Sequence, residues 1–336
     1  MKVLIVGLGS VGQRHVRILR KIFKNNISLF VLNSSRNNIV IKDNFKTLKV
    51  NSLSDYYNLK KINISEIKKN NINVAFICNP TNLHLKTAYD LLKVNCNLLI
   101  EKPLSAFEEL NNIKKLIKFS KKKKLVVQVG YQLRFHPGIK IVKNIIKNNE
   151  LGEVFDGYFH FGEYFNSLRK WEKFSDSIVS KKKFGGGVLG AHSHHLDLAM
   201  FLLGKLKCKY SLLTNSNNFK IDVEDCCKII LTNNKNKNFL FNMNFLDDPQ
   251  ENSFILNFKK GSLKWNYIEN TVLIKKYKDS KIKKIKFNNF YRNDLFEKQT
   301  KNFFSKIKKK NYENQSFVDG FEIMKLINEI RKKNVN

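Results

Sequence analysis

Near its N-terminus the chain reads KVLIVGLGSVG, residues 2–12. The aliphatic, β-branched run predicts a buried strand, and the apolar spacing of residues 16–22 predicts a helix directly after it. Gly7, Gly9 and Gly12 stand between the two elements. A Gly-x-Gly-x-x-Gly turn that joins a strand to a helix is typical of dinucleotide-binding folds, so this stretch decides the fold of the first part of the chain.

Each glycine has its own physical role. Gly7 allows the tight turn, Gly9 lets the backbone approach a pyrophosphate, and Gly12 permits close packing of helix and strand. Ser10 and Val11 open the helix, whose N-terminus offers free N–H groups and the positive end of its dipole to an anion. We therefore expect these five residues to bind a cofactor. The alternative is a glycine-rich turn without a ligand.

Strands and helices alternate after this turn. Apolar runs predict strands over 27–32, 74–78, 98–100 and 125–129, and helical spacing predicts helices over 83–92 and 104–119. Strands that alternate with helices form right-handed crossovers and a parallel, doubly wound sheet. The sequence thus predicts an α/β fold with a Rossmann domain over residues 1–128.

The pattern changes after Pro137. Residues 154–164 alternate like a strand with one exposed face, and residues 195–203 predict a helix. From residue 209 to about residue 287, strand-like runs alternate with Asn/Lys/Gly turns, which predicts an antiparallel sheet with one face open to solvent or to a partner. Two helices are expected over 294–308 and 316–333. We expect a second α/β domain over residues 129–315 and a final helical segment over 316–336.

Composition excludes several classes of protein. The 62 basic and 28 acidic residues give a net charge of +34, but the lysines are spread along the chain without an aromatic-interleaved basic stripe, so we expect no specific nucleic-acid partner. No apolar run reaches about 18 residues, so we expect no membrane span. The five cysteines show no C-x-x-C spacing, which favours a reducing, cytoplasmic compartment.

The end of the second predicted strand bears on the choice between NAD and NADP. An acid at this position would bind the ribose 2′-hydroxyl of NAD. The chain instead has Asn33, Ser34, Ser35 and Arg36, and small hydroxyls with an arginine suit a 2′-phosphate. These four residues are expected cofactor contacts, and they favour NADP. The alternative is that Arg36 is a solvated loop residue.

Two polar motifs follow later strands, at the sheet edge where open α/β sheets bind ligands. We expect cofactor contacts from Asn79, Pro80, Thr81, His84, Glu101 and Lys102. A lysine beside the cofactor can also hydrogen-bond a substrate oxygen and stabilise developing negative charge. The alternatives are that Asn79 and His84 satisfy local backbone groups and that Lys102 is an ordinary surface lysine.

Residues 185–197 read GGGVLGAHSHHLD and precede a predicted helix. Three of the seven histidines of the chain lie within four positions here. No cysteine or carboxylate is convincingly spaced to complete a metal site, so we expect none. Because imidazole titrates near neutral pH, an acid–base role is favoured. The alternative is a group of histidines that only packs.

Taken together, these motifs resemble the Gfo/Idh/MocA family, the relatives of glucose–fructose oxidoreductase and inositol dehydrogenase. The resemblance covers nearly the whole chain, and its specificity lies in the order and spacing of the motifs. It includes GLGSVGQRH at 7–15, the Asn79 and Glu101 motifs, GYQLRFHP at 130–137, LGEV at 151–154, the histidine segment and NDLFE at 293–297. The GQRH start and Ser193-His194-x-x-Asp197 look most like members from bacterial surface-sugar gene sets.

The resemblance implies an N-terminal Rossmann domain and a C-terminal domain with a large, mostly antiparallel sheet. The open face of that sheet would form a homodimer or homotetramer, and the last helix would pack back on the first domain. Lys102 takes the role of the catalytic lysine and His194 that of the catalytic histidine. Candidate substrate contacts are Tyr131, Arg134, Trp171, His192 and Asp197. The alternative for Arg134 is an ion pair at the domain hinge, and for Trp171 it is core packing.

The activity implied is hydride transfer between NAD(P) and a carbinol or ketone carbon of a sugar or nucleotide sugar, in the synthesis of surface-polysaccharide or glycan precursors. The chain departs from the family at Gly190, where many members have an aspartate four residues before the histidine. This departure gives weight to an alternative, a non-catalytic dinucleotide-binding regulator or partner protein.

Overall fold

The computed structural model describes residues 1–32, 38–106, 109–165 and 171–335. The chain forms two compact units. The first comprises residues 1–131 and 292–324, and the second comprises residues 132–291 and 325–336. Each unit contains one large sheet with helices, and the predicted α/β class is confirmed. None of the helices within the described residues is long and apolar enough to cross a bilayer.

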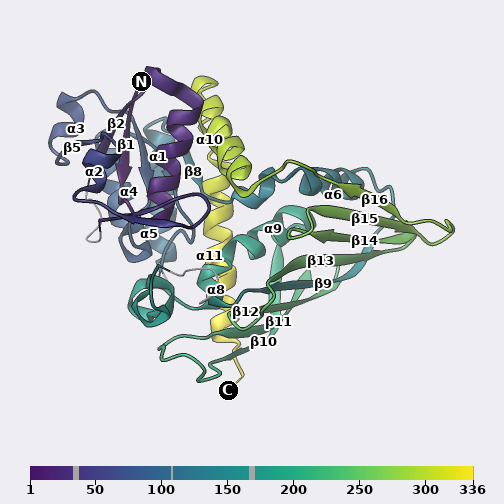
Figure 1. The fold of residues 1–336 in the computed structure, drawn as a ribbon. Coiled ribbons are helices and arrows are strands. Elements are labelled where there is room, and N and C mark those ends of the chain that lie inside the picture. The colour runs from purple at the N-terminus through teal and green to yellow at the C-terminus, as the bar shows by residue number, and fades with distance from the viewer. Residues whose placement is uncertain (33–37, 107–108, 166–170, 336) are drawn as a thin grey trace. The chain divides into compact units, whose positions relative to one another are not determined.

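The first unit contains a six-stranded, wholly parallel sheet in the order β5-β2-β1-β6-β7-β8 (Figure 1). Its strands are β1 (Lys2–Val6), β2 (Ser28–Leu32), β5 (Lys60–Lys61), β6 (Val74–Ile77), β7 (Asn97–Ile100) and β8 (Val127–Val129). The strand order reverses direction between β1 and β6. Open α/β sheets bind their ligands at such a switch point, outside the carboxyl ends of the strands. The predicted parallel sheet is thus confirmed, together with the edge that matters for a site.

The helices of this unit are α1 (Ser10–Phe23), η1 (Lys24–Asn26), α2 (Leu53–Tyr56), α3 (Glu66–Lys69), η2 (Thr81–Leu83), α4 (His84–Lys93), α5 (Leu110–Lys122) and α10 (Arg292–Lys308). The helix expected from residue 104 begins only at Leu110 within the described residues. Before it, the Ser105 hydroxyl donates to the Glu109 carboxylate at 2.7 Å. A small hairpin, β3 (Ile39–Ile41) with β4 (Thr47–Lys49), was not predicted.

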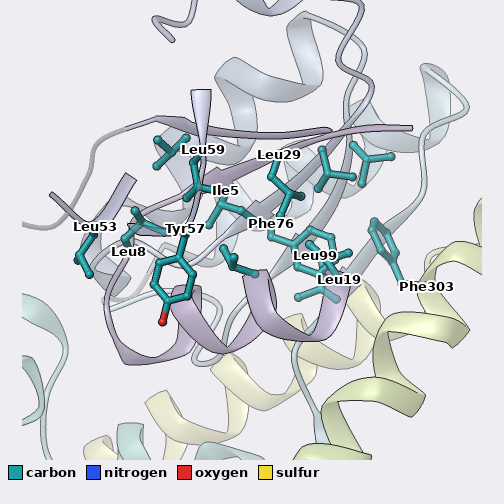
Figure 2. Close-up of a cluster of buried hydrophobic side chains, with 14 of the residues drawn as sticks. Ile5, Leu8, Leu19, Leu29, Leu53, Tyr57, Leu59, Phe76, Leu99 and Phe303 are labelled. Carbon is teal, nitrogen blue, oxygen red and sulfur yellow. The ribbon is translucent and has the colours of Figure 1, made fainter. Parts of the chain in front are cut away.

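The core of the first unit joins α1, the sheet and α10. Figure 2 shows Ile5, Leu19, Phe76 and Leu99 in one buried cluster with Phe303 of α10. The Phe76 and Phe303 rings meet edge to face, with centroids 5.8 Å apart. We expected residues 292–308 in the second domain; aromatic packing against the Rossmann sheet instead places α10 in the first unit.

The second unit contains an eight-stranded sheet in the order β10-β11-β12-β9-β13-β14-β15-β16. Every pair is antiparallel except β12 with β9, so the large, mostly antiparallel sheet is confirmed. The strands are β9 (Val154–Gly162), β10 (Leu206–Thr214), β11 (Cys226–Asn233), β12 (Asn238–Asn244), β13 (Glu251–Phe258), β14 (Gly261–Asn266), β15 (Thr271–Lys276) and β16 (Lys283–Lys286).

One face of this sheet carries the core. Phe159 of β9 stacks on Phe241 of β12 with ring centroids 4.5 Å apart, and both side chains are fully buried. The helices of the unit are η3 (Gln132–Phe135), α6 (Pro137–Lys147), η4 (Phe174–Asp176), η5 (Ile178–Ser180), η6 (Lys182–Phe184), α8 (Val188–Ala191) and α9 (Ser193–Leu203). The last helix, α11 (Gln315–Lys332), contributes residues up to Met324 to the first unit and the rest to the second.

Candidate active site

The glycine turn of the first unit is shaped by close backbone contacts. Gly7 has φ +89°, and a Cβ there would lie 2.9 Å from the Cα of Asn79. A Cβ on Gly12 would lie 2.1 Å from the Gly7 carbonyl oxygen. At Gly9, by contrast, no described atom lies within 4 Å of the position that a Cβ would take. Packing therefore requires glycine at two positions, and the third leaves the backbone open to a ligand.

The N-terminus of α1 has the chemistry of an anion site. Gly9 is the N-cap residue, and among the described side chains none caps this helix by a hydrogen bond or places an acid in its first turn. The first N–H groups of a helix lack intrahelical partners and carry the positive end of the dipole. With Ser10 and Val11 half-buried beside the open Gly9, the turn fits the pyrophosphate of NAD or NADP.

The turn after β6 lies against the glycine turn, since Gly7 and Asn79 approach so closely. The Asn79 amide donates to Thr87 Oγ1 at 2.9 Å. His84 is buried, with Nε2 3.0 Å from the Asn79 carbonyl and Nδ1 2.9 Å from the Pro103 carbonyl. The expected alternative for His84, bonding to local backbone, is therefore present, and its contact with a cofactor stays a prediction. Pro80 and Thr81 are half-buried in the same turn.

Lys102 follows β7 on the same sheet edge. Its two neighbours in sequence, Glu101 and Pro103, each contact a buried histidine. The buried His15 donates from Nε2 to the Glu101 carboxylate at 2.7 Å. On the other side, the Pro103 carbonyl contacts His84. Lys102 itself is half-buried. His15 thus holds the side chain before the lysine proposed for catalysis, and His84 holds the backbone carbonyl of the residue after it.

His15 is a residue whose role the sequence analysis missed. Its place one turn into the helix that follows the glycine turn was a signal for burial, although not for its partner Glu101. Cys78 lies at the same edge, and burial raises the pKa of its thiol well above the ordinary value. A raised pKa keeps the thiol protonated, and a protonated thiol is a poor nucleophile.

The histidine segment of the second unit forms a separate cluster. His192 and His195 are buried and His194 is half-buried. Each ring offers a nitrogen, and the three nitrogens all lie within 4.8 Å of one another. The His195 ring stacks on Phe161 of β9, with centroids 3.7 Å apart and planes 6° apart. We had considered His195 only as one of three clustered histidines, and its stacking on Phe161 was not predicted.

The glycines before this cluster are also tightly fitted. Gly187 has φ +97°, and a Cβ on Gly190 would lie 2.7 Å from the Gly185 carbonyl oxygen. The position where many family members have an aspartate therefore has no room for a side chain unless the backbone shifts. The glycine at position 190 is therefore required by the backbone conformation of this segment.

Arg134 and Asp197 form an ion pair within the second unit. Arg134 Nε donates to Asp197 Oδ2 at 2.8 Å, and a second guanidinium nitrogen contacts Oδ1. The guanidinium also lies over the Phe201 ring, 4.9 Å from its centroid. The alternative for Arg134 was an ion pair at the domain hinge; the ion pair is present, formed within the second unit with a residue that we had also predicted for substrate, and its place at a hinge stays a prediction. Substrate contact by either residue stays a prediction.

Tyr131 and Trp171 were also predicted as substrate contacts. Tyr131 is buried at the end of the first unit's leading segment, and Trp171 is half-buried in a turn of the second unit. Asn33, Ser34, Ser35 and Arg36 lie outside the described residues. The first unit thus brings together Gly7, Gly9, Gly12, Asn79, His84, Glu101 and Lys102, and the second brings together the three histidines.

Two family models match the chain. A model described as an oxidoreductase family with an NAD-binding Rossmann fold matches residues 1–131, and the GFO/IDH/MocA C-terminal domain matches residues 139–264. The uncharacterized oxidoreductase YrbE of Bacillus subtilis is 24% identical over 68% of this chain and 62% of its own length. Myo-inositol 2-dehydrogenase of Thermotoga maritima is 21% identical over 61% of this chain and 55% of its own length. The chain thus spans about three-fifths of the length of these curated relatives.

Solved structures share the fold over nearly the whole chain. A levoglucosan dehydrogenase in complex with NADH and levoglucosan has a TM-score of 0.83 at 15% identity, and covers 99% of this chain and 96% of its own. A 3-ketoreductase from Actinomadura kijaniata in complex with NADP and TDP-benzene has a TM-score of 0.80 at 15% identity, with coverages of 99% and 98%. At such identities the likeness shows the fold alone.

Proposed function

We propose that this chain, which belongs to the Gfo/Idh/MocA oxidoreductase family, transfers a hydride between a nicotinamide coenzyme and a carbinol or ketone carbon of a sugar or nucleotide sugar. One observation carries the proposal: the open glycine turn and the braced Lys102 lie at the same edge of one parallel sheet. That edge supplies an anion site for the coenzyme and an ammonium group for a substrate oxygen.

The coenzyme, when bound, accepts or supplies the hydride. The backbone at Gly9, Ser10 and Val11 binds the pyrophosphate. Lys102 donates a hydrogen bond to the substrate oxygen and stabilises the negative charge that develops on it. In the direction of oxidation, His194 takes the hydroxyl proton on an imidazole nitrogen; in reduction it returns that proton. An acid–base group of this kind contributes about 10²–10⁴ in rate.

A polyhydroxylated substrate is supported by the relatives. Their names describe an inositol dehydrogenase, a levoglucosan dehydrogenase and a ketoreductase crystallised with a TDP compound. Tyr131, Trp171 and His192 remain proposed substrate contacts. Because Arg134 and Asp197 hold each other, we propose that they position the start of α9. The GQRH and SHxxD resemblance supports a place in surface-glycan precursor synthesis, and the reducing, cytoplasmic setting stays part of this proposal.

For the coenzyme, NADP is the proposed preference. Its support is the absence of an acid and the presence of Arg36 in the sequence after β2. Arg36→Ala should weaken NADPH binding and leave NADH binding almost unchanged, as measured by the quenching of protein fluorescence. Equal losses for the two coenzymes would contradict the preference.

We propose a homodimer or homotetramer built on the open face of the large sheet. Across that face the strand register aligns Tyr210, Ile230, Leu240, Tyr158 and Ile255 in one row. Tyr210, Leu240 and Tyr158 are each more than a third exposed. Leu240→Glu should therefore shift the mass measured by light scattering toward the monomer. An unchanged mass would count against this interface.

Turnover tests the function directly. We expect Lys102→Ala and His194→Ala each to reduce kcat about 10²–10⁴-fold against a panel of sugars and nucleotide sugars, followed by nicotinamide absorbance. Lys86→Ala, an exposed lysine of α4, and His160→Ala, in β9, are the matched controls. If either active-site variant keeps full turnover with coenzyme bound, its role is misassigned.

The tight fit at Gly190 favours one alternative, a dinucleotide-binding regulator without catalysis. Such a protein would bind the coenzyme through the glycine turn and need no proton donor. Coenzyme binding without turnover across the whole panel would support this alternative, and measurable turnover that depends on Lys102 would exclude it.

A further inference from the structure

The three imidazoles at the start of α9 form a cluster that the proposed reaction does not fully use. Only His194 has a proton to move in that reaction. His192 and His195 are buried, with 4% and 2% of their surfaces exposed, and yet their nitrogens converge with that of His194 within 4.8 Å. Three imidazole nitrogens that converge in this way have the residue types and the proximity of a metal ligand set. The convergence itself is the observation to be explained.

Two aromatic rings of the sheet region contact the cluster. Phe161 holds the His195 ring by stacking, and Phe245 lies 5.7 Å from the His192 ring. Leu196 and Ala199 of α9 are fully buried in the same helix. Aromatic contacts of this kind limit the access of water to a metal site.

We propose that His192, His194 and His195 bind one first-row divalent transition-metal ion, of which Zn²⁺ is the best fit. Three histidines with an open fourth position are a common zinc ligand set. Zn–N bonds of about 2.0–2.1 Å in a tetrahedron place nitrogens about 3.4 Å apart. The nitrogens, which lie within 4.8 Å of one another, therefore have to approach by up to about 1.4 Å, which side-chain rotation can supply. Nitrogen ligands exclude Mg²⁺ and Ca²⁺, which prefer oxygen.

The ion would compete with the proton on His194. This consequence rests on the proposed function, in which the imidazole of His194 accepts or returns the substrate proton. A nitrogen that binds a metal ion cannot hold that proton. Hydride transfer should therefore fall as the site fills and return when a chelator removes the ion. A metal ion that raises turnover would overturn this consequence while leaving the binding site itself in place.

Binding is tested on the full chain without coenzyme or sugar, with Co²⁺ as the spectroscopic probe. We expect one equivalent of Co²⁺ to give the intense visible d–d bands of a four-coordinate ion. Zn²⁺ should abolish the bands because it binds more tightly than Co²⁺, and Mg²⁺ should not. His192→Asn and His195→Asn should each weaken Co²⁺ binding at least 10–100-fold, the range that even outer-shell changes cost. His160→Asn, which alters a histidine of β9 outside the cluster, is the control.

A separate measurement guards against variants that fail to fold. Zn²⁺ should raise the melting temperature of the unmodified protein, because an ion that binds only the folded state stabilises it, whereas Mg²⁺ should not. The site is overturned if the unmodified protein gives no four-coordinate bands, if Zn²⁺ leaves its melting temperature unchanged, or if His160→Asn loses binding as completely as His192→Asn. Because no readout here involves turnover, a catalytically inactive protein that binds Co²⁺ would refute only the proposed function.

Discussion

The glycine turn after β1 and the histidine segment before α9 are polar sites built from different parts of the chain. The first consists of backbone: two glycines fitted against carbonyl and Cα atoms, and a third left open at a helix N-terminus. The second consists of side chains: three imidazoles brought together by a helix start and a phenylalanine of the sheet. A site built from backbone requires a local sequence pattern that can be recognised. A site built from side chains depends on tertiary contacts that position each ring.

The largest expected effect tests whether side chains hold the second site. Asp197 is almost fully buried and Arg134 is 17% exposed, so Asp197→Ala leaves a poorly hydrated guanidinium without its carboxylate partner. We expect a loss of about 3 kcal/mol in the free energy of unfolding, measured with urea, which is the low end for a buried pair. The exposed pair of Lys235 with Glu153 is the matched control, and Lys235→Ala should change little. Equal effects would mean that Arg134 and Asp197 do not position α9.

The next prediction separates packing from ligand contact in the first site. Gly12→Ala drives a Cβ onto the Gly7 carbonyl, and should cost about 2–3 kcal/mol of unfolding free energy as well as coenzyme affinity. Gly9→Ala enters open space, so stability should change by less than about 0.5 kcal/mol while coenzyme binding weakens. Urea unfolding and coenzyme titration of both variants give the comparison. If Gly9→Ala binds coenzyme normally, the open position is not where the pyrophosphate lies.

The sequence predicted the backbone site at the glycine turn better than the side-chain site at the histidine segment. The glycine turn and the Asn79 and Glu101 motifs were predicted because strand order alone brings the carboxyl ends of β1, β6 and β7 to one edge. The brace from His15 to Glu101 spans 86 positions, and no local pattern encodes it. The convergence of His195 with its neighbours depends on Phe161, and the place of α10 depends on Phe303; both are long-range packing contacts that periodicity does not reveal.

Gly190 offers a test with a smaller expected effect. It lies in the histidine segment, but its own close contact is with a backbone carbonyl. Gly190→Ala brings a Cβ to 2.7 Å from the Gly185 carbonyl, a milder conflict than that at Gly12. We expect a cost of about 1–2 kcal/mol in urea unfolding. No cost would show that the segment can relax, and would reopen the possibility of restoring the family aspartate there.

The smallest effect concerns His84, a side chain that braces the backbone site. Burial lowers its pKa in the folded state below the ordinary value of about 6.5. As the pH falls below about 6.5, the unfolded chain binds a proton that the folded chain excludes, so stability present above that pH is lost until the folded pKa is reached. His84→Gln should remove this part of the pH dependence in urea unfolding between pH 8 and pH 5. Thr87→Val, which breaks the bond from Asn79 in the same turn without removing a titrating group, should keep it. If both variants keep the slope, the His84 imidazole does not titrate as its burial requires, and the first site owes its rigidity to backbone contacts alone.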